Sequence, residues 1–225
     1  MKHRETSTPI SDRVLEILEA TPAAAARGKG FLERIARFTE ALGVWGARTN
    51  LTAHPEDPVE VAFHVIDSLA PLFVTPPLNL FGPQTQVLDL GSGAGFPGLI
   101  LAAASDAEFI LIEARRKRAS FLSASATEMG LTNVTVICRR ATPATVGEDF
   151  DVLTSRAVGE ASIEIAAKAL RPGGVALLWA SPEQQIAAGL FRAAGLSEPI
   201  RHEYVVRRGS AVTRRSLLVA RKSLT

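Results

Sequence analysis

Hydrophobic residues recur at helical spacing through the first third of the chain. Three segments show the pattern: SDRVLEILEA from Ser11, FLERIARFTEALGVWG from Phe31 and PVEVAFHVIDSLAPLF from Pro58. Each places apolar side chains three or four positions apart, as an amphipathic helix requires. We expect Ser11 to cap the first helix, because a hydroxyl there can accept a backbone N–H. Up to Phe73 the chain is therefore predicted to be helical.

From Gln86 the pattern changes to short apolar runs that alternate with amphipathic segments. The runs are QVLDL, FILIE, VTVIC, FDVLTS and VALLWA, and such continuous runs are typical of strands buried on both faces. EYVVRR and SLLVARK, joined by a turn near Gly209 and Ser210, predict an antiparallel hairpin at one sheet edge. The fold class is therefore α/β, a mostly parallel, doubly wound sheet with a C-terminal hairpin. We divide it into an N-terminal helical extension (1–75) packed on a core domain (76–225).

Composition and charge add two constraints. The 225 residues are 47% hydrophobic, which fits one large domain or a domain with a small appendage. The formal net charge is only +2, yet the stretch from Arg201 to Thr225 holds seven basic residues against Glu203 alone. This asymmetry indicates either a polyanionic partner or a solvated basic face.

Cys138 is the only cysteine, so an intrachain disulfide and a thiolate metal cluster are both excluded. A chain of this kind suits a reducing compartment. No apolar run reaches the roughly 20 residues of a membrane span, and MKHRETSTPISDR lacks the apolar core of a secretion signal. We expect a cytoplasmic protein with no membrane partner and no metal.

The stretch VLDLGSGAGFPG contains the most specific pattern. After a strand that ends at Leu90, glycines stand at positions 91, 93 and 95, where they permit positive φ angles and close approach of a ligand. The spacing is G-x-G-x-G, whereas a pyrophosphate loop has G-x-G-x-x-G, and no G-K-[ST] follows. Asp89 would repel a pyrophosphate but could receive a cationic amino group, directly or through water. The pattern favours S-adenosylmethionine over a dinucleotide; the alternative is a turn that uses glycine only for packing.

Glu113 ends the next apolar run, on the order of 20 residues beyond the glycines. A carboxylate at that position can accept hydrogen bonds from ribose hydroxyls. The alternative is an ordinary exposed strand end.

Several short stretches between about residues 43 and 157 together carry a family resemblance. They are NLT (50–52), HVIDSL (64–69), DLGSGAGFPG (89–98), EARRKRASFL (113–122) and SRA (155–157). In this combination the chain resembles the bacterial 16S rRNA guanine-N7 methyltransferases, the RsmG or GidB family. The F-P-G after the third glycine and the K-R-x-x-F-L after the acidic residue go beyond a generic methyltransferase loop. The resemblance implies a Rossmann-like Class I methyltransferase fold.

The same resemblance implies a set of site residues. It adds Gly91, Phe96, Glu113, Ala141, Thr142 and Arg156 as cofactor contacts, beside Asp89, Gly93 and Gly95 from the loop spacing. In this set Ala141 and Thr142 would flank the adenine, and Arg156 would lie on the cofactor or substrate side. The chain departs from the family in two places: Thr142 replaces the usual acidic residue, and Ala180 and Ser181 stand where a lysine and glycine are common.

Methyl transfer to guanine N7 needs no general base, because N7 carries a free lone pair and the sulfonium methyl is already activated. We therefore name no catalytic acid or base. The substrate-side candidates are Asn50, His64, Asp67 and Arg156. His64 and Asp67 lie on one helix face, where they either fix the helix to a neighbouring loop or border the cleft.

A run of basic residues follows the strand that carries Glu113, at the ligand-binding edge of the sheet, where it could meet RNA phosphates or form a solvated face. The candidates are Arg48, Arg115, Arg116, Lys117, Arg118, Arg139, Arg207 and Arg208, and Arg140, Arg214 and Arg215 could extend the surface. We expect Trp45 to be a core residue rather than a stacking platform.

The resulting functional hypothesis is methyl transfer from S-adenosylmethionine to N7 of one guanosine in 16S ribosomal RNA. The expected partner is that RNA or the small ribosomal subunit, with no DNA, and the protein is expected to be a monomer. Three alternatives stay open: a methyltransferase acting on a protein or small molecule, a non-catalytic RNA-binding relative, and a nicotinamide-dependent oxidoreductase, which the glycine spacing disfavours.

Overall fold

The computed structural model describes residues 8–46, 48–74, 78–156 and 158–224. Ala157, the last residue of the SRA stretch, lies outside these ranges. None of the helices within them is both long enough and apolar enough to cross a membrane.

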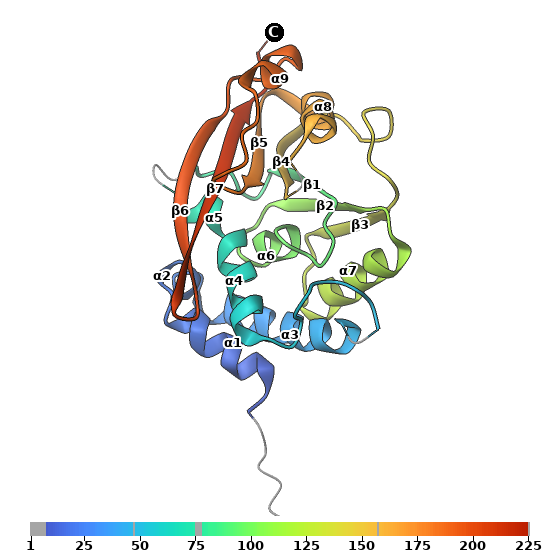
Figure 1. Ribbon diagram of the computed structural model, residues 1–225. Helices are drawn as coiled ribbons and strands as arrows, with labels where there is room; N and C mark the ends of the chain where they lie inside the picture. Colours follow the sequence, from blue (N-terminus) through green and yellow to red (C-terminus); the bar gives the residue numbers. More distant parts are fainter. Residues whose placement is uncertain (1–7, 47, 75–77, 157, 225) are drawn as a thin grey trace, which may run out of the picture.

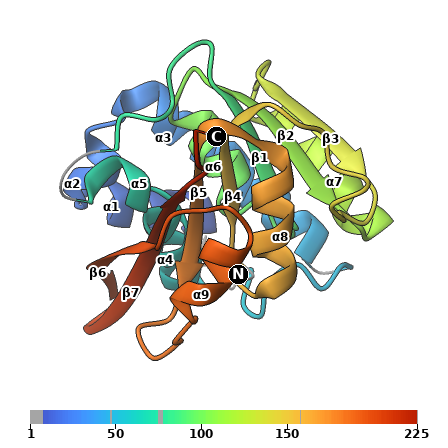
Figure 2. The same ribbon diagram turned by 90° about the horizontal axis from the view of Figure 1, so that it is seen from above.

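Within the described residues, seven strands form one sheet in the order β3-β2-β1-β4-β5-β7-β6 (Figure 1). The parallel strands are β1 (Gln86–Leu90), β2 (Glu108–Glu113), β3 (Val134–Cys138), β4 (Phe150–Ser155) and β5 (Leu170–Ala180). Strand β7 (Ala211–Arg221) runs antiparallel between β5 and the edge strand β6 (Ile200–Arg208). Figure 2 shows this hairpin at the opposite end of the sheet from β2 and β3. The predicted doubly wound sheet with a C-terminal hairpin is confirmed.

Helices cover both faces of the sheet. One face carries α1 (Ile10–Glu19), α2 (Pro22–Ala25), α3 (Gly28–Gly46), α4 (Pro58–Ser68), α5 (Ala70–Phe73), α6 (Gly98–Ala103) and α7 (Arg116–Glu128), and the other carries α8 (Glu160–Ala169) and α9 (Ala188–Ala193). Alternate strand residues point to opposite layers. Leu177 and Trp179 of β5 therefore pack with the N-terminal helices, whereas Leu178 packs with α8. The helical lead-in shares one apolar cluster with the sheet.

Several local predictions differ from the structure. Ser11 does not cap α1, because the helix begins at Ile10 after Pro9 and buries the Ser11 side chain 3.5 Å from Glu40 of α3. Pro97, whose missing N–H would suit a first helical position, instead caps α6, which begins at Gly98. The apolar spacing from Pro182 to Gly195 predicts one longer helix, but within it only α9 is an α-helix.

The C-terminal hairpin is longer than its apolar runs suggest. Its turn lies at Gly209, whose φ is +62°, and Ser210. Ala180, the last residue of β5, pairs with Ser216. Residues 204–215, which we call the hairpin overhang, therefore extend beyond the carboxyl end of β5.

Candidate functional site

The glycine loop after β1 adopts a backbone that side chains disfavour. The φ angles of Gly91, Gly93 and Gly95 are +66°, +55° and +89°, in the left-handed region. A Cβ on Gly91 would meet no atom within 4 Å, whereas one on Gly95 would lie 2.7 Å from Leu99. Gly91 thus faces open space where a ligand can approach, and Gly95 is required for packing against α6.

Glu113, at the carboxyl end of β2, holds this loop in place. One carboxylate oxygen accepts the Gly93 amide at 3.0 Å and the other accepts the Arg115 amide at 2.8 Å. The residue is only 6% exposed, which differs from an ordinary exposed strand end. Each oxygen keeps a lone pair for a further donor, such as a ribose hydroxyl.

A pocket of about 470 Å³ opens beside Glu113. It lies at the carboxyl ends of β1, β2 and β4, where the strand order reverses, and this is the usual ligand position in doubly wound sheets. Its lining residues are Leu90, Gly91, Ile112, Glu113, Ala114, Arg139, Arg140, Ala141, Ser155, Val158, Gly159, Ala161, Ser162 and Ile165. Apolar walls with one buried carboxylate suit a nucleoside.

Asp89 differs from its predicted role. Its side chain is fully buried and points toward α6, because strand residues alternate and Leu88 and Leu90 take the α8 side of the sheet. Thr154 donates a hydrogen bond of 2.6 Å to Oδ1. Burial raises the pKa of this carboxyl group. Asp89 does not line the pocket. Its carboxylate lies against Gly98 at the start of α6, where it supports the glycine loop and does not face the ligand site.

Phe96 lies on the α4 side of the loop and also does not line the pocket. Its ring centre is 5.2 Å from that of His64, and the guanidinium of Arg156 lies 5.5 Å from the ring centre. Arg156 follows β4 directly, so these side chains form a second wall near the glycine loop.

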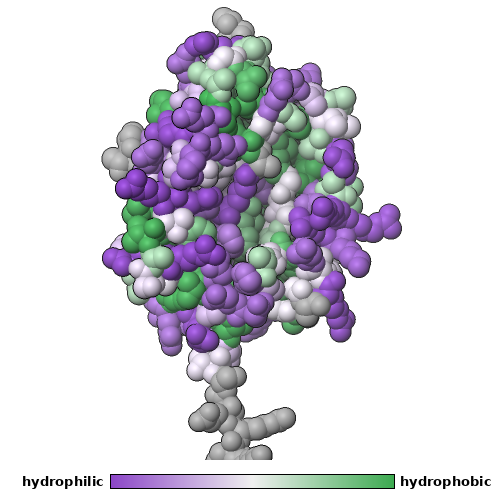
Figure 3. All heavy atoms as spheres, viewed as in Figure 1, coloured by the Kyte–Doolittle hydropathy of each residue, from purple (hydrophilic) through white to green (hydrophobic). Residues whose placement is uncertain are grey.

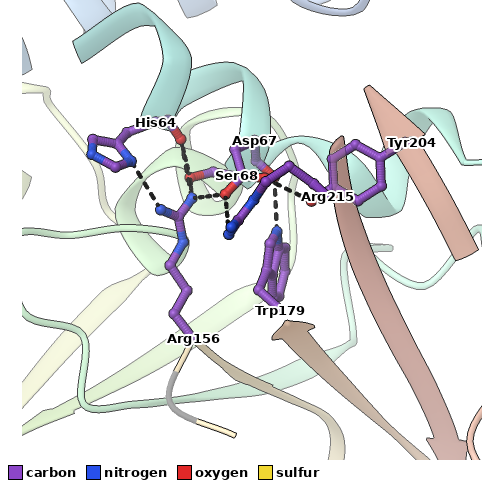
Figure 4. Close-up of polar contacts among 7 residues, drawn as sticks. All are labelled: His64, Asp67, Ser68, Arg156, Trp179, Tyr204 and Arg215. Carbon is purple, nitrogen blue, oxygen red and sulfur yellow. Dashed lines mark hydrogen bonds and ion pairs between the residues drawn. The ribbon is translucent and has the colours of Figure 1, made fainter. Parts of the chain in front are cut away.

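Asp67, at the end of α4, is the centre of a buried polar network (Figure 4). Its carboxylate lies 3.2 Å from Arg156, accepts the Tyr204 hydroxyl at 2.7 Å and accepts Arg215 at 3.1 Å. Its backbone carbonyl accepts the Trp179 indole at 2.8 Å. Asp67 thus links α4 to Arg156, which follows β4, and to one side chain each of β5, β6 and β7.

Arg156 is also held by the last turn of α4. It donates to the Ser68 hydroxyl at 2.8 Å and to the His64 carbonyl at 3.1 Å. Burial, together with the charge of Arg156, lowers the pKa of His64 to about 4, so the imidazole is neutral at pH 7. Burial and the neighbouring Asp67 raise the pKa of Tyr204, which therefore remains a hydrogen-bond donor. His64 and Asp67 thus fix α4 to the sheet, and the His64 ring also packs against Phe96 of the glycine loop.

The remaining cofactor and substrate candidates differ in their position relative to this pocket. Ala141 lines the pocket, whereas the exposed Thr142 hydroxyl lies 3.0 Å from that of Thr145. The carbonyl of Asn50 accepts a hydrogen bond of 2.7 Å from Arg118. That contact joins the α3–α4 connection to the start of α7.

The basic candidates separate into different environments. Arg139 and Arg140 line the pocket, while Arg48 and Lys117 border a smaller pocket of about 270 Å³ with Trp45. Trp45 is half-buried, with its ring centre 6.0 Å from that of Phe121, as expected for a core residue. Exposed positions also hold Arg115, Arg116, Arg207 and Arg214.

Two arginines of the hairpin are engaged within the protein. Arg208 pairs with Glu60, and Arg215 pairs with Asp67. Both are therefore weaker RNA-binding candidates than the sequence suggested. Sequence reasoning missed Tyr204, Arg215 and Trp179 as partners of Asp67, since only the sheet order brings them to α4.

Comparisons with known proteins bear on this site. The family model described as rRNA small subunit methyltransferase G (GidB) matches residues 31–205. Ribosomal RNA small subunit methyltransferase G of Laribacter hongkongensis is 35% identical over 158 residues, covering 68% of this chain and 73% of the relative. The protein of the same description from Wolinella succinogenes is 44% identical over 128 residues, covering 56% of this chain and 62% of the relative. The chain thus spans less than two thirds of the Wolinella relative.

Solved structures share the fold at low sequence identity. M. jannaschii TYW2 in complex with AdoMet has a TM-score of 0.54 at 14% identity, covering 78% of both chains. The [4+2]-cyclase SpnF has a TM-score of 0.53 at 17% identity, covering 74% of this chain and 82% of that one. A SAM-dependent O-methyltransferase from Thermotoga maritima has a TM-score of 0.50 at 17% identity, covering 65% and 62%. The expected Rossmann-like methyltransferase fold is confirmed, and the cyclase shows that this fold alone does not decide the reaction.

Proposed function

The chain belongs to the rRNA small subunit methyltransferase G family, and we propose that it transfers a methyl group from S-adenosylmethionine to N7 of one guanosine in 16S ribosomal RNA. The single observation that carries the cofactor assignment is the arrangement of Glu113 with the glycine loop. The RNA substrate follows from the family.

The residues present fit the cofactor. Apolar walls can enclose an adenine, the buried Glu113 can accept ribose hydroxyls, and the open space above Gly91 admits close approach of a ligand. Gly91, Gly93, Glu113 and Ala141 would hold the nucleoside, and Thr142 would contact the adenine edge from the rim. Asp89 would act on the cofactor only through the loop that it supports.

The cofactor supplies an activated methyl group. The lone pair of guanine N7 forms the new bond to the methyl carbon while the carbon–sulfur bond breaks and its electron pair stays on sulfur. No proton leaves N7, so the protein has to position and stabilise rather than to remove a proton. This chemistry is compatible with a neutral His64 and with a Tyr204 that stays protonated.

Arg156 is the substrate-side residue with the strongest support. Its guanidinium lies over Phe96 of the glycine loop and is fixed by Asp67, Ser68 and His64. Arg156 and Arg215 together exceed the charge of Asp67 by one unit, so this wall is cationic and suits an anionic substrate. Arg48, Lys117 and Arg118 would contact RNA phosphates on the other side. We further propose that the protein acts as a cytoplasmic monomer on 16S rRNA or the small subunit.

Transfer of labelled methyl to 16S rRNA from a strain that lacks this gene, followed by mapping of the label, tests the proposal. We expect one guanosine to be labelled at N7. Gly91→Asp should abolish transfer, because Gly91 lines the pocket and its side chain would enter the open space where the ligand approaches. Gly195→Asp is the matched control, since it places the same group on similarly left-handed backbone with open space around it. Label on protein, or no label with wild-type enzyme, would refute the substrate assignment. Failure of the wild-type protein to bind S-adenosylmethionine in calorimetry would refute the enzyme assignment.

A further inference from the structure

The hairpin overhang stands at the same edge of the sheet as the cofactor pocket. Strand β7 pairs with β5 only from Ser216 onward, so the preceding residues project past the carboxyl ends of the parallel strands. Figure 1 shows the hairpin passing the end of β5 and continuing along α4. Three strand spacings, or about 15 Å, separate β1 from β7. The overhang is therefore within a few nucleotides' reach of a base held at the glycine loop.

The inner face of the overhang is fully engaged with α4. Tyr204 and Arg215 bind Asp67, and Arg208 pairs with Glu60 while lying 5.5 Å from the ring centre of Phe63. In these contacts the carboxylates of Glu60 and Asp67 neutralise the charges of the inner-face arginines, Arg208 and Arg215. They also fix the overhang to the rest of the molecule.

The outer face is free of such contacts. The register pairs Val205 with Arg214 and Arg207 with Val212, and directly opposed residues point to the same side of a sheet. All four side chains are exposed, the valines by 60% and 57%. Among the described residues neither arginine has a charged or hydrogen-bonding partner. In the view of Figure 3, hydrophilic side chains cover much of the hairpin side, with hydrophobic patches among them.

We propose that this outer face, Val205, Arg207, Val212 and Arg214, binds the phosphate backbone of the RNA next to the target guanosine; this inference rests on the proposed function. Arg207 and Arg214 are diagonal neighbours, with Cα atoms about 7–8 Å apart, so their long side chains can contact neighbouring phosphates. The outer face belongs to the same side of the sheet as Leu218 and Leu178, the side on which α8 borders the pocket.

The chemistry favours a nucleic acid over an acidic protein. Two guanidinium groups that form no ion pair match a polyanionic backbone, and the neighbouring valines offer apolar contact to sugars and unstacked bases. The exposed Glu203 lies on the same side of β6, so these three charged side chains sum to +1. Because the inner face fixes the overhang, little conformational entropy is lost when RNA binds. Arg208 and Arg215 fix the hairpin overhang to α4, and Arg207 and Arg214 contact the RNA.

The test compares the double variant Arg207→Ala/Arg214→Ala with the control Arg27→Ala/Arg37→Ala. The control removes two exposed arginines at the amino edge of the sheet, where Arg27 borders a pocket with Asp106 and Arg37 lies near Gly130. Binding to protein-free 16S rRNA is measured at several salt concentrations. We expect the outer-face variant to lose about tenfold in affinity near 0.1 M salt, and its log–log salt slope to fall by about 1.4–1.8. The control should match the wild type, and Arg207→Lys/Arg214→Lys should recover most of the affinity.

Each outcome has a distinct meaning. Calorimetry should give all variants the wild-type affinity for S-adenosylmethionine, which also shows that they are folded. Unchanged RNA affinity and salt slope in the outer-face variant, with active wild-type enzyme, would overturn this inference and leave the proposed function standing. A defect seen with intact subunits but not with protein-free rRNA would overturn it in favour of a protein partner. If the wild type neither binds nor methylates rRNA, the proposed function fails and this inference falls with it.

Discussion

Asp67 and Arg156 form an ion pair of 3.2 Å that joins the end of α4 to the residue following β4. The Asp67 side chain is fully buried and the Arg156 side chain is 21% exposed. Because the same carboxylate also binds Tyr204 and Arg215, the wall beside the glycine loop depends on the C-terminal hairpin.

Replacing Asp67 with asparagine should be strongly destabilising. The amide keeps the shape but removes the charge, which leaves Arg156 and Arg215 partly buried without compensation. We expect a loss of about 3 kcal/mol in the free energy of unfolding, measured by urea denaturation. Glu60→Gln breaks the more exposed pair with Arg208 and should cost less than about 1 kcal/mol. Equal effects of the two substitutions would contradict this account of the network.

Replacing Glu113 with glutamine should weaken cofactor binding. Both carboxylate oxygens accept backbone amides, and an amide nitrogen in place of one oxygen cannot accept. We expect the affinity for S-adenosylmethionine, measured by calorimetry, to fall at least about tenfold, since the loop and the ribose both lose an acceptor. Glu108→Gln, at the exposed start of β2, serves as the control and should bind normally. Normal cofactor binding by Glu113→Gln would contradict the proposed role of Glu113 in binding the ribose.

Gly98 should tolerate no side chain. A Cβ at this position would lie 2.5 Å from both the Asp89 carboxylate and Leu111. We expect Gly98→Ala to destabilise the protein by about 2–3 kcal/mol, because both neighbours are buried. A Cβ on Gly43 in α3 would meet nothing within 4 Å, so Gly43→Ala should be neutral or stabilise by about 0.5–1 kcal/mol. Both variants are compared by thermal unfolding under identical conditions. Similar melting temperatures for Gly98→Ala and Gly43→Ala would contradict the prediction.

His64 should make stability depend on pH. Its pKa falls from 6.5 to about 4 on folding, chiefly through burial, so the unfolded chain binds the proton more readily. Stability from this group is complete above pH 6.5 and is lost as the pH falls toward 4, by about 2 kcal/mol after allowance for partial exposure. In His64→Asn this part of the pH dependence should vanish. The free energy of unfolding is measured for wild type and variant between pH 4 and 7. The same change with pH in both proteins would refute the assignment.

The sheet and the glycine loop were predictable because their signals are local. Continuous apolar runs gave the strands, and the spacing of Gly91, Gly93 and Gly95 gave a loop whose positive φ angles the structure shows. The orientation of Asp89 follows from strand alternation, whereas its charge alone suggested a contact with the ligand. The partners of Asp67 could not be read from the sequence, since they meet only after β7 inserts between β5 and β6.

The position of β7 also has a consequence for biosynthesis. During translation α4 and β4 emerge well before Arg215, and β6 has no neighbour in the sheet until β7 has been made. Nascent chains that have not yet reached Arg215 would carry Asp67 and Arg156 without their third charged partner. Such late, long-range pairing is slow in folding. This wall of the site can therefore be completed only after Arg215 has been made, so shorter nascent chains lack the full network around Asp67.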